Sequence, residues 1–317
     1  MLEHVARFLL SAFLAIGMAG TASAAPGKRV ALVIGNADYA NIGRLMKPIN
    51  DAQAVADVLK RLGYEVILGT NAKNGDLLGL AEKFRVGVKS ADVGFFYYSG
   101  HGFQTNSIAQ HPVNHVVPVD FNVDTVDAAL ATLALDVIID TLRSQTRLGF
   151  IFMDACRNDP QLAAASERLA AGGKSITISR GFSPINVAEE RRPTVQPRAG
   201  KEPTGLLIAY ATDPGNVALE GDIGILSPFT SALVKHIGTP GLSAAEVMGR
   251  VSQDVSLQTA GKQTPWNVSS LTAGTYQFVP KPERIIQPSS TPGPRATPPP
   301  AAPRQEPRQP KAPFQLQ

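Results

Sequence analysis

The chain has 317 residues, of which 44% are hydrophobic and 18% are charged, and its formal net charge is +4. This length is ample for one α/β domain with a large core, and the sequence has no compact basic patch with interleaved aromatic residues that would indicate nucleic-acid binding. The single cysteine excludes an internal disulfide and leaves either a free thiol or one that pairs with another chain.

The N-terminal residues 1–24 have the pattern of a secretory signal peptide. Arg7 precedes the apolar run 8–20, and the small residues 22–24 fit a cleavage site that would make Ala25 the mature N-terminus. A retained membrane anchor is the alternative, but the run is short for a bilayer span. The sequence therefore predicts an exported protein, periplasmic or secreted, with no stable membrane anchor after cleavage.

Apolar strands and amphipathic helices alternate along the next part of the chain. Strands are expected at the apolar runs 29–35, 64–68, 93–98, 148–153 and 204–210. Helical spacing of apolar residues is found at 54–62, 77–88, 135–142, 227–237 and 243–259. Asn50 and Asp51 are candidate caps of the first helix and Ser243 of the last, and a short strand near 275–279 would close the fold. The alternation predicts an α/β fold, a mostly parallel central sheet with helices on both faces.

Two segments lack this pattern. Residues 161–203 are rich in Gly, Ser, Arg and Pro, which predicts a flexible linker inside the domain. Residues 280–317 are rich in Pro and poor in aromatics, which predicts a disordered tail. The tail is interpreted as a spacer, and contact with an acidic surface is the alternative.

Two of the expected strands lead into residues that can do chemistry. The run 93–98 continues into Ser99-Gly100-His101-Gly102, and the run 148–153 continues into Asp154-Ala155-Cys156. Open α/β sheets keep their active sites at the carboxyl ends of the strands, and a thiol nucleophile needs a base that is near in space. Either residue alone could be a buried small side chain or a turn histidine. Both together, in this order, predict a catalytic pair.

These motifs resemble those of the caspase-like cysteine peptidases, and most closely the bacterial metacaspase-like branch. The resemblance covers roughly residues 28–278 and rests on the stretches 49–52, 97–102, 154–157, 208–212 and 227–230. Asp154 stands where the caspase signature has a glutamine. The resemblance implies a caspase-like three-layer sandwich, with a large-subunit-like part at 28–160 and a small-subunit-like part of the same domain at 204–279.

The resemblance also implies a cysteine endopeptidase. In such an enzyme Cys156 attacks the peptide carbonyl, and His101 takes the thiol proton and later protonates the leaving amine. The backbone N–H groups of Gly102 and Cys156 are the implied donors to the oxyanion. Because no acidic residue is clearly placed as a third member, a dyad is predicted. The alternatives are a catalytically silent interaction or scaffold module and a different hydrolase on a similar sheet.

Three residues match positions that line an acidic substrate pocket in metacaspases, which cut after Arg or Lys. They are Asp51, Ser99 and Asp154, and a pair of carboxylates is a natural receptor for a guanidinium or ammonium group. The alternatives are a plain helix cap for Asp51 and a loop-bracing role for Asp154. Pro48 is a departure, because many metacaspases carry a cysteine there.

The expected partner is a peptide or protein substrate, no cofactor is predicted, and the oligomeric state is left open. Many metacaspases require calcium, so calcium is an alternative, but no compact loop with ligand spacing is formed by the available acidic residues Asp120, Asp124, Asp127, Asp136 and Asp159. The arginines of 161–203 are possible sites of self-cleavage, and a mere surface insertion is the alternative.

Overall fold

The computed structural model describes residues 27–106, 112–122, 131–156, 178–179, 205–213, 218–219, 224–271 and 276–282. The described residues up to Lys281 belong to one compact unit. The signal predicted at 1–24, nearly all of the linker predicted at 161–203 and the tail beyond residue 282 lie outside these ranges. Within the ranges, no helix combines the length and the apolar character that crossing a bilayer requires.

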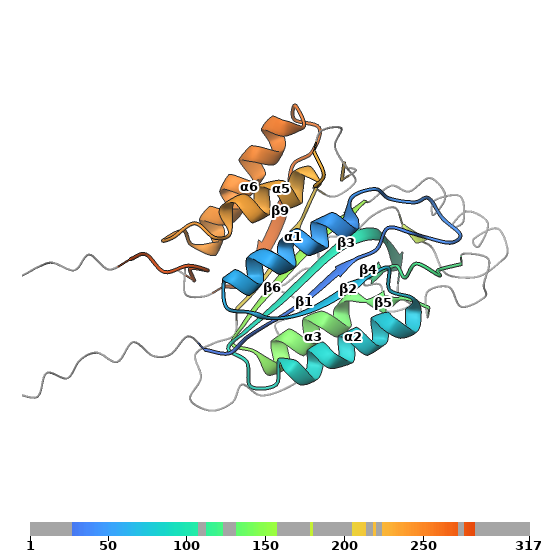
Figure 1. Cartoon of the computed structure of the whole chain (residues 1–317), viewed down its shortest axis with the longest axis horizontal. Coiled ribbons are helices and arrows are strands. Elements are labelled where there is room, and N and C mark those ends of the chain that lie inside the picture. The colour runs from blue at the N-terminus through green and yellow to red at the C-terminus, as the bar shows by residue number, and fades with distance from the viewer. Residues whose placement is uncertain are drawn as a thin grey trace, which may run out of the picture. The chain divides into compact units, whose positions relative to one another are not determined.

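A central sheet crosses this unit with the strand order β2-β1-β3-β6-β8-β9 (Figure 1). The strands along this path are β1 (Arg29–Gly35), β2 (Glu65–Thr70), β3 (Val93–Asn106), β6 (Leu148–Cys156), β8 (Gly205–Tyr210) and β9 (Trp266–Ser269). Neighbours from β2 to β8 are parallel, and β9 is antiparallel to β8. The continuous apolar runs predicted this arrangement, because such strands need cover on both faces.

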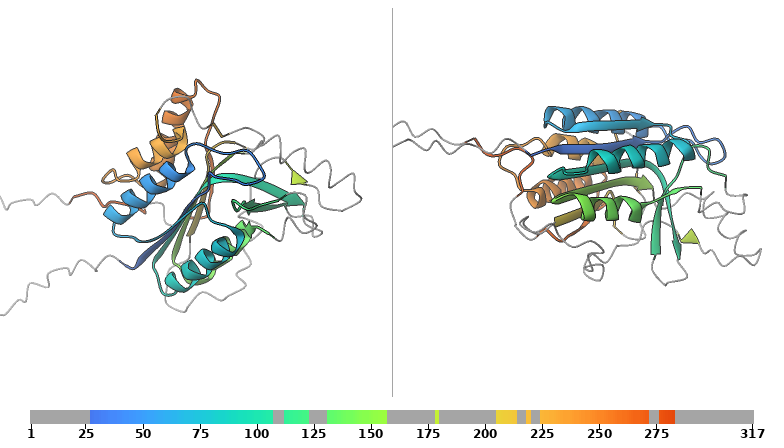
Figure 2. Two further views of the ribbon diagram at one scale, coloured as in Figure 1. Left: turned by 45° about the vertical axis from the view of Figure 1, so that its right-hand side comes forward. Right: turned by 90° about the horizontal axis from the view of Figure 1, so that it is seen from below.

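Helices cover both faces of the sheet, so the unit has three layers (Figure 2). One core cluster joins one face to α1 (Pro48–Arg61), α5 (Pro228–His236) and α6 (Ala244–Gln258). A second cluster joins the other face to α2 (Asn74–Gly87) and α3 (Leu135–Gln145). Alternate residues of each strand enter opposite clusters, as the pleat requires. The predicted fold class is thereby confirmed.

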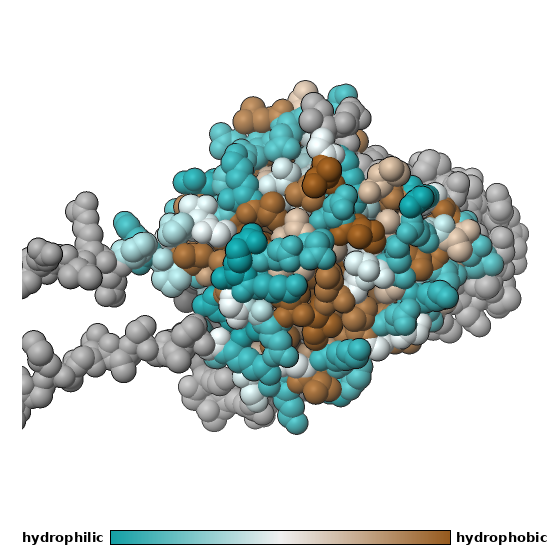
Figure 3. Space-filling model, viewed as in Figure 1, coloured by the Kyte–Doolittle hydropathy of each residue, from teal (hydrophilic) through white to brown (hydrophobic). Residues whose placement is uncertain are grey.

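The edge strand β2 is less covered than the strands beside it. Its central residues are only partly buried, and apolar residues reach the surface between α1 and α2 (Figure 3). At the other edge, Trp266 of β9 stacks on Tyr210 with ring centroids 6.1 Å apart. Trp266 is therefore a packing residue at this edge.

β3 is longer than the sequence predicted. It continues past Tyr98 to Asn106, where it pairs antiparallel with β4 (Pro112–Val116) and β7 (Ile178–Ser179); β4 in turn pairs with β5 (Leu133–Ala134). The glycines at 100 and 102 interrupt the apolar pattern without ending the strand. His101 consequently lies within a strand, not at the end of one.

Two further boundaries were predicted wrongly. α1 begins at Pro48, because proline is suited to the first helical turn, where its missing N–H has no intrahelical role; Asp51 is thus inside the helix and does not cap it. The closing strand is β9, while among the described residues 276–279 of the predicted strand only Gln277 makes a bridge, an isolated one to Ser243. The predicted cap at Ser243 is confirmed, since its hydroxyl accepts from the Glu246 N–H.

Gly35 allows α1 to lie close against the end of β1. A Cβ at this position would be 2.2 Å from the carbonyl oxygen of Pro48 and 2.7 Å from the Cβ of Ala52. We expect Gly35→Ala to displace α1 and to lower the free energy of unfolding by about 1–3 kcal/mol, measured by urea denaturation.

The control for this variant is Gly79→Ala on α2, where a Cβ would meet nothing within 4 Å. This substitution should raise the free energy of unfolding by about 0.5–1 kcal/mol, because alanine favours the helix. Equal effects of the two substitutions would show that the contact between β1 and α1 does not require a glycine.

Candidate active site

His101 and Cys156 occupy the same rung of the β3–β6 ladder. The register is unbroken from Val93↔Leu148 to His101↔Cys156, and adjacent strands lie about 4.8 Å apart. Gly102 follows on β3, opposite Val116 of β4. The backbones of three predicted site residues are thus neighbours, while the side chain of Cys156 falls outside the described part of the chain.

The imidazole of His101 is held in one tautomer by the backbone. His101 is 3% exposed, and its Nε2 lies 2.6 Å from the carbonyl oxygen of Gly43. A carbonyl oxygen only accepts hydrogen bonds, so Nε2 carries the hydrogen. In the neutral ring, Nδ1 is then the nitrogen with the lone pair that can take a proton.

The backbone of His101 lies between two tyrosines that the sequence did not single out for this role. The hydroxyl of Tyr39 accepts from the His101 N–H at 2.8 Å, and the hydroxyl of Tyr98 donates to the His101 carbonyl at 2.6 Å. The Tyr39 ring also contacts the imidazole, with centroids 4.5 Å apart. Gly100 has a φ of +154°, and a Cβ there would lie within 2.7 Å of both hydroxyls. Glycine is therefore required beside the histidine.

The three predicted pocket residues come together from three elements. Asp51 lies in the first turn of α1, Ser99 on β3 and Asp154 on β6, and all are buried. They line a partly open pocket of about 260 Å³, open solvent included. Pro48 and Lys47 line it as well, so the residue that departs from the metacaspase pattern belongs to the same site.

Hydroxyl and amide groups surround the two carboxylates. Oδ2 of Asp154 accepts from the hydroxyls of Thr230 at 2.7 Å, of Tyr97 at 3.3 Å and of Ser227. Asp51 accepts from the Ser99 hydroxyl at 3.1 Å and from the Ser227 N–H at 2.9 Å. The helix-cap interpretation of Asp51 is therefore wrong, because its carboxylate bonds to other elements.

Ser227 links the two carboxylates to α5. Its N–H donates to Asp51 and its hydroxyl donates to Asp154, while the same hydroxyl caps α5 by accepting from the Thr230 N–H at 2.9 Å. The sequence predicted a helix over 227–237 and a family resemblance at 227–230, but no role for Ser227 in the pocket. The Ser-Pro start of this stretch is the signature of a capped helix, and in the structure Ser227 is the cap of α5 and lines the pocket.

Another wall of the pocket comes from Ala218 and Leu219. The side chain of Gln263, which is fully buried, accepts from the Leu219 N–H at 2.9 Å and donates to the Ala211 carbonyl at 2.7 Å. This glutamine therefore ties that wall to the end of β8.

The carboxylate pair is electrostatically strained. Burial, followed by the nearby charge of Asp154, raises the pKa of Asp51 to about 8, although the Ser227 N–H, the Ser99 hydroxyl and the charge of Lys47 act in the opposite direction. Two buried carboxylates this close resist double ionisation. At neutral pH, the carboxyl of Asp51 is thus mostly protonated.

The acidic residues considered for calcium are not gathered in the described structure. Asp120 accepts from the N–H of Asn74 at 2.9 Å, and Asp136 lies in the first turn of α3; the others, Asp124, Asp127 and Asp159, lie outside the described residues. Among the residues that are described, no cluster of three or more His, Cys, Asp or Glu side chains is arranged for a metal ion.

Comparison with known proteins points to one family. The sequence matches the model of the caspase domain over residues 28–276. A protein of Geobacter sulfurreducens with a solved structure is 14% identical, with a TM-score of 0.51 over 81% of this chain and 95% of that one. Caspase-1 of Spodoptera frugiperda is 17% identical, with a TM-score of 0.49 over 81% of this chain and 91% of that one. No curated protein has a detectably similar sequence.

The raised pKa of Asp51 predicts how stability depends on pH. Its pKa of about 8 in the folded chain exceeds the ordinary value of 3.8, so ionisation opposes folding. The contribution of this carboxyl to the free energy of unfolding is fully present below about pH 4 and is lost as pH rises through 8. Relative to Asp51→Asn, which cannot ionise, the wild type should lose up to about 1.4 kcal/mol per pH unit across this window.

Urea denaturation of both proteins at pH 4, 6, 8 and 9 measures this difference. Asp57→Asn is the matched control, because Asp57 lies on the same helix with its side chain 48% exposed, and its difference from wild type should stay nearly constant. A constant difference for Asp51→Asn as well would contradict the assigned burial of charge.

Proposed function

The chain belongs to the caspase domain family, and from this premise we propose that it is a cysteine endopeptidase that hydrolyses peptide bonds after Arg or Lys, with Cys156 and His101 as its dyad. One observation carries the proposal: two pairs of facing residues on β3 and β6 would supply the catalytic groups and part of the substrate pocket. His101↔Cys156 form one rung, and Ser99↔Asp154 lie two residues earlier on the same strands.

The distance between these rungs suits a long basic side chain. Two residues of a strand span about 6.6 Å. A substrate whose scissile carbonyl lies at Cys156 can therefore extend the preceding side chain along the strands to Asp154 and Asp51. Carboxylates are suited to guanidinium and ammonium groups by charge and by geometry, and this is the support for basic specificity.

The chemistry follows from the tautomer of His101. Nδ1 takes the thiol proton, while the hydrogen on Nε2 stays in its hydrogen bond to the Gly43 carbonyl. The thiolate then attacks the substrate carbonyl carbon. The backbone N–H groups of Gly102 and Cys156 stabilise the oxyanion. His101 then returns the proton to the departing amine as the C–N bond breaks, which leaves an acyl-enzyme. A water molecule, deprotonated by His101, hydrolyses the thioester and restores the thiol.

Recognition of a basic side chain is coupled to the ionisation of Asp51. Before the substrate binds, the carboxyl of Asp51 is mostly protonated at neutral pH, because its pKa is about 8. A cation placed between the two carboxylates favours the ionised form of both. Binding therefore releases a proton at neutral pH, and it becomes more favourable as the pH rises towards 8.

A panel of fluorogenic peptides with Arg, Lys, citrulline or Asp before the scissile bond tests the proposal, with and without calcium. We expect turnover of the Arg and Lys peptides only, reduction to background by Cys156→Ala, and a KM raised at least about tenfold by Asp154→Asn, as expected for loss of a charged hydrogen-bond partner. Cleavage after Asp alone would refute the pocket assignment. Absence of any turnover, together with failure of an electrophilic Arg peptide to label Cys156, would favour a silent scaffold module.

The pH dependence of specificity is a separate prediction. The ratio of kcat/KM for the Arg peptide to that for its uncharged citrulline analogue should rise with pH, by up to about tenfold per unit below pH 8, and then level off. Taking the ratio cancels titration of the dyad, which both peptides share. In Asp51→Asn the ratio should be nearly independent of pH, and an unchanged slope in that variant would mean that another group titrates.

A further inference from the structure

The loop between β1 and α1 supplies two of the contacts that fix His101. These are the hydroxyl of Tyr39, which accepts from the His101 N–H, and the carbonyl of Gly43, which accepts from Nε2. The loop closes on itself through a hydrogen bond from the Leu45 N–H to the Ala37 carbonyl at 3.1 Å. Ala37 and Leu45 thus form the base of this loop, and Tyr39 and Gly43, which lie between them in sequence, contact His101.

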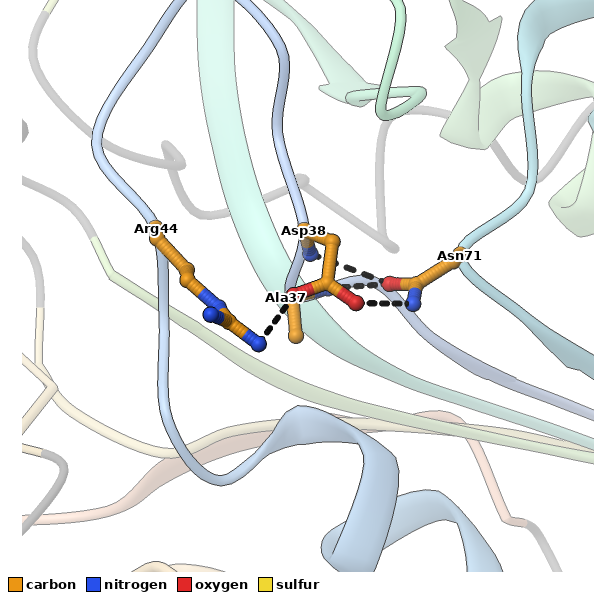
Figure 4. Close-up of polar contacts among 4 residues, drawn as sticks. All are labelled: Ala37, Asp38, Arg44 and Asn71. Carbon is orange, nitrogen blue, oxygen red and sulfur yellow. Dashed lines mark hydrogen bonds and ion pairs between the residues drawn. The ribbon is translucent and has the colours of Figure 1, made fainter.

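Asn71, directly after β2, holds the base of this loop (Figure 4). Its Oδ1 accepts from the N–H groups of Ala37 and Asp38, both at 3.0 Å, and its Nδ2 donates to the Asp38 carboxylate at 2.6 Å. Its φ of +49° is in the left-handed region, where asparagine and aspartate are the favoured residues after glycine.

Asp38 continues the connection towards the histidine. Its carboxylate also pairs with Arg44 at 2.7 Å (Figure 4), and Arg44 is the residue after Gly43. Both side chains of this ion pair are exposed, by 71% for Arg44 and 48% for Asp38, so the pair adds little by itself. The three hydrogen bonds of Asn71, two of them from backbone N–H groups, contribute more to holding the loop than this ion pair does.

We propose that Asn71, acting with Asp38, is a positioning residue for His101: it fixes the β1–α1 loop so that the Gly43 carbonyl holds the imidazole with Nδ1 available to the thiol of Cys156. The inference rests on the proposed function. Asn71 touches neither substrate nor reacting atoms. Its effect falls on the proton-transfer step, because a displacement of about 1 Å at a catalytic group costs on the order of 100-fold in rate.

The substitution Asn71→Asp isolates this role without straining the backbone. Aspartate tolerates the left-handed conformation and keeps an acceptor for the two N–H groups, but it places an oxygen against the Asp38 carboxylate where Nδ2 donated. The second substitution Asp38→Asn restores a donor and acceptor at that contact with their positions exchanged. The double variant Asp38→Asn/Asn71→Asp should therefore recover what Asn71→Asp loses.

Two readouts are needed, well below the melting temperature of each variant. In peptide cleavage, Asn71→Asp should lower kcat by about tenfold or more and leave KM for Arg peptides within about twofold, because neither Asn71 nor Asp38 lines the acidic pocket. The second readout is the rate at which iodoacetamide alkylates Cys156, the single cysteine of the chain, which depends on the neighbouring base and not on any peptide. It should fall in parallel, and the double variant should return to within about threefold of wild type in both.

The outcomes separate this inference from the proposed function. If the wild type cleaves no peptide, the proposed function fails, and the alkylation series alone decides the role of Asn71. If Asn71→Asp leaves kcat and alkylation unchanged, or if the double variant is no better than Asn71→Asp, the inference is overturned. A rise in KM with an unchanged kcat would equally refute it. Asn267→Asp on the exposed part of β9 is the matched control and should behave as wild type.

Discussion

The register of β3 against β6 is the constraint on which the rest of the structure depends. Both strands are buried on two faces, and Phe95 stacks on Phe152 with ring centroids 4.9 Å apart. A slip of one residue would exchange the faces of every side chain on one strand, which would drive apolar residues out of both core clusters. The packing of the core thereby also fixes that His101 lies opposite Cys156 and that Ser99 lies opposite Asp154.

The acidic pocket lowers the stability of the fold, whereas the packing of the core raises it. Asp51 and Asp154 are buried in the same pocket, and burial with the nearby charge raises the pKa of Asp51 to about 8. This burial is unfavourable for the isolated fold, and the proposed function gives it a use in binding a basic side chain. Hydroxyls from β3 and α5, and the N–H of Ser227, offset part of this cost. The cluster is thus a set of fixed dipoles arranged around two buried carboxyl groups.

The sequence predicted those features that have a local signature. Continuous apolar runs indicated the strands that lie inside the sheet, and the histidine and cysteine were found because each follows such a run. The start of α1 at Pro48 and the extension of β3 were missed, since a proline and two glycines resemble interruptions in a linear pattern. The contacts of Gly43 and Asn71 had no signature at all, because a backbone carbonyl can belong to any residue and a loop contact depends on the folded path.

The bridge formed by Ser227 makes the pocket a late product of folding. The hydrogen bond from Ser227 to Asp51 joins residues 176 positions apart, and the bond to Asp154 spans 73. Contacts of such large sequence separation form only after the intervening chain has closed its loops. A chain still emerging from synthesis can pair β1 with β3 and β3 with β6, yet it lacks the residue that joins the two carboxylates. The acidic pocket is therefore complete only when the C-terminal helices have docked, so the unfinished chain lacks the site on which the proposed specificity depends.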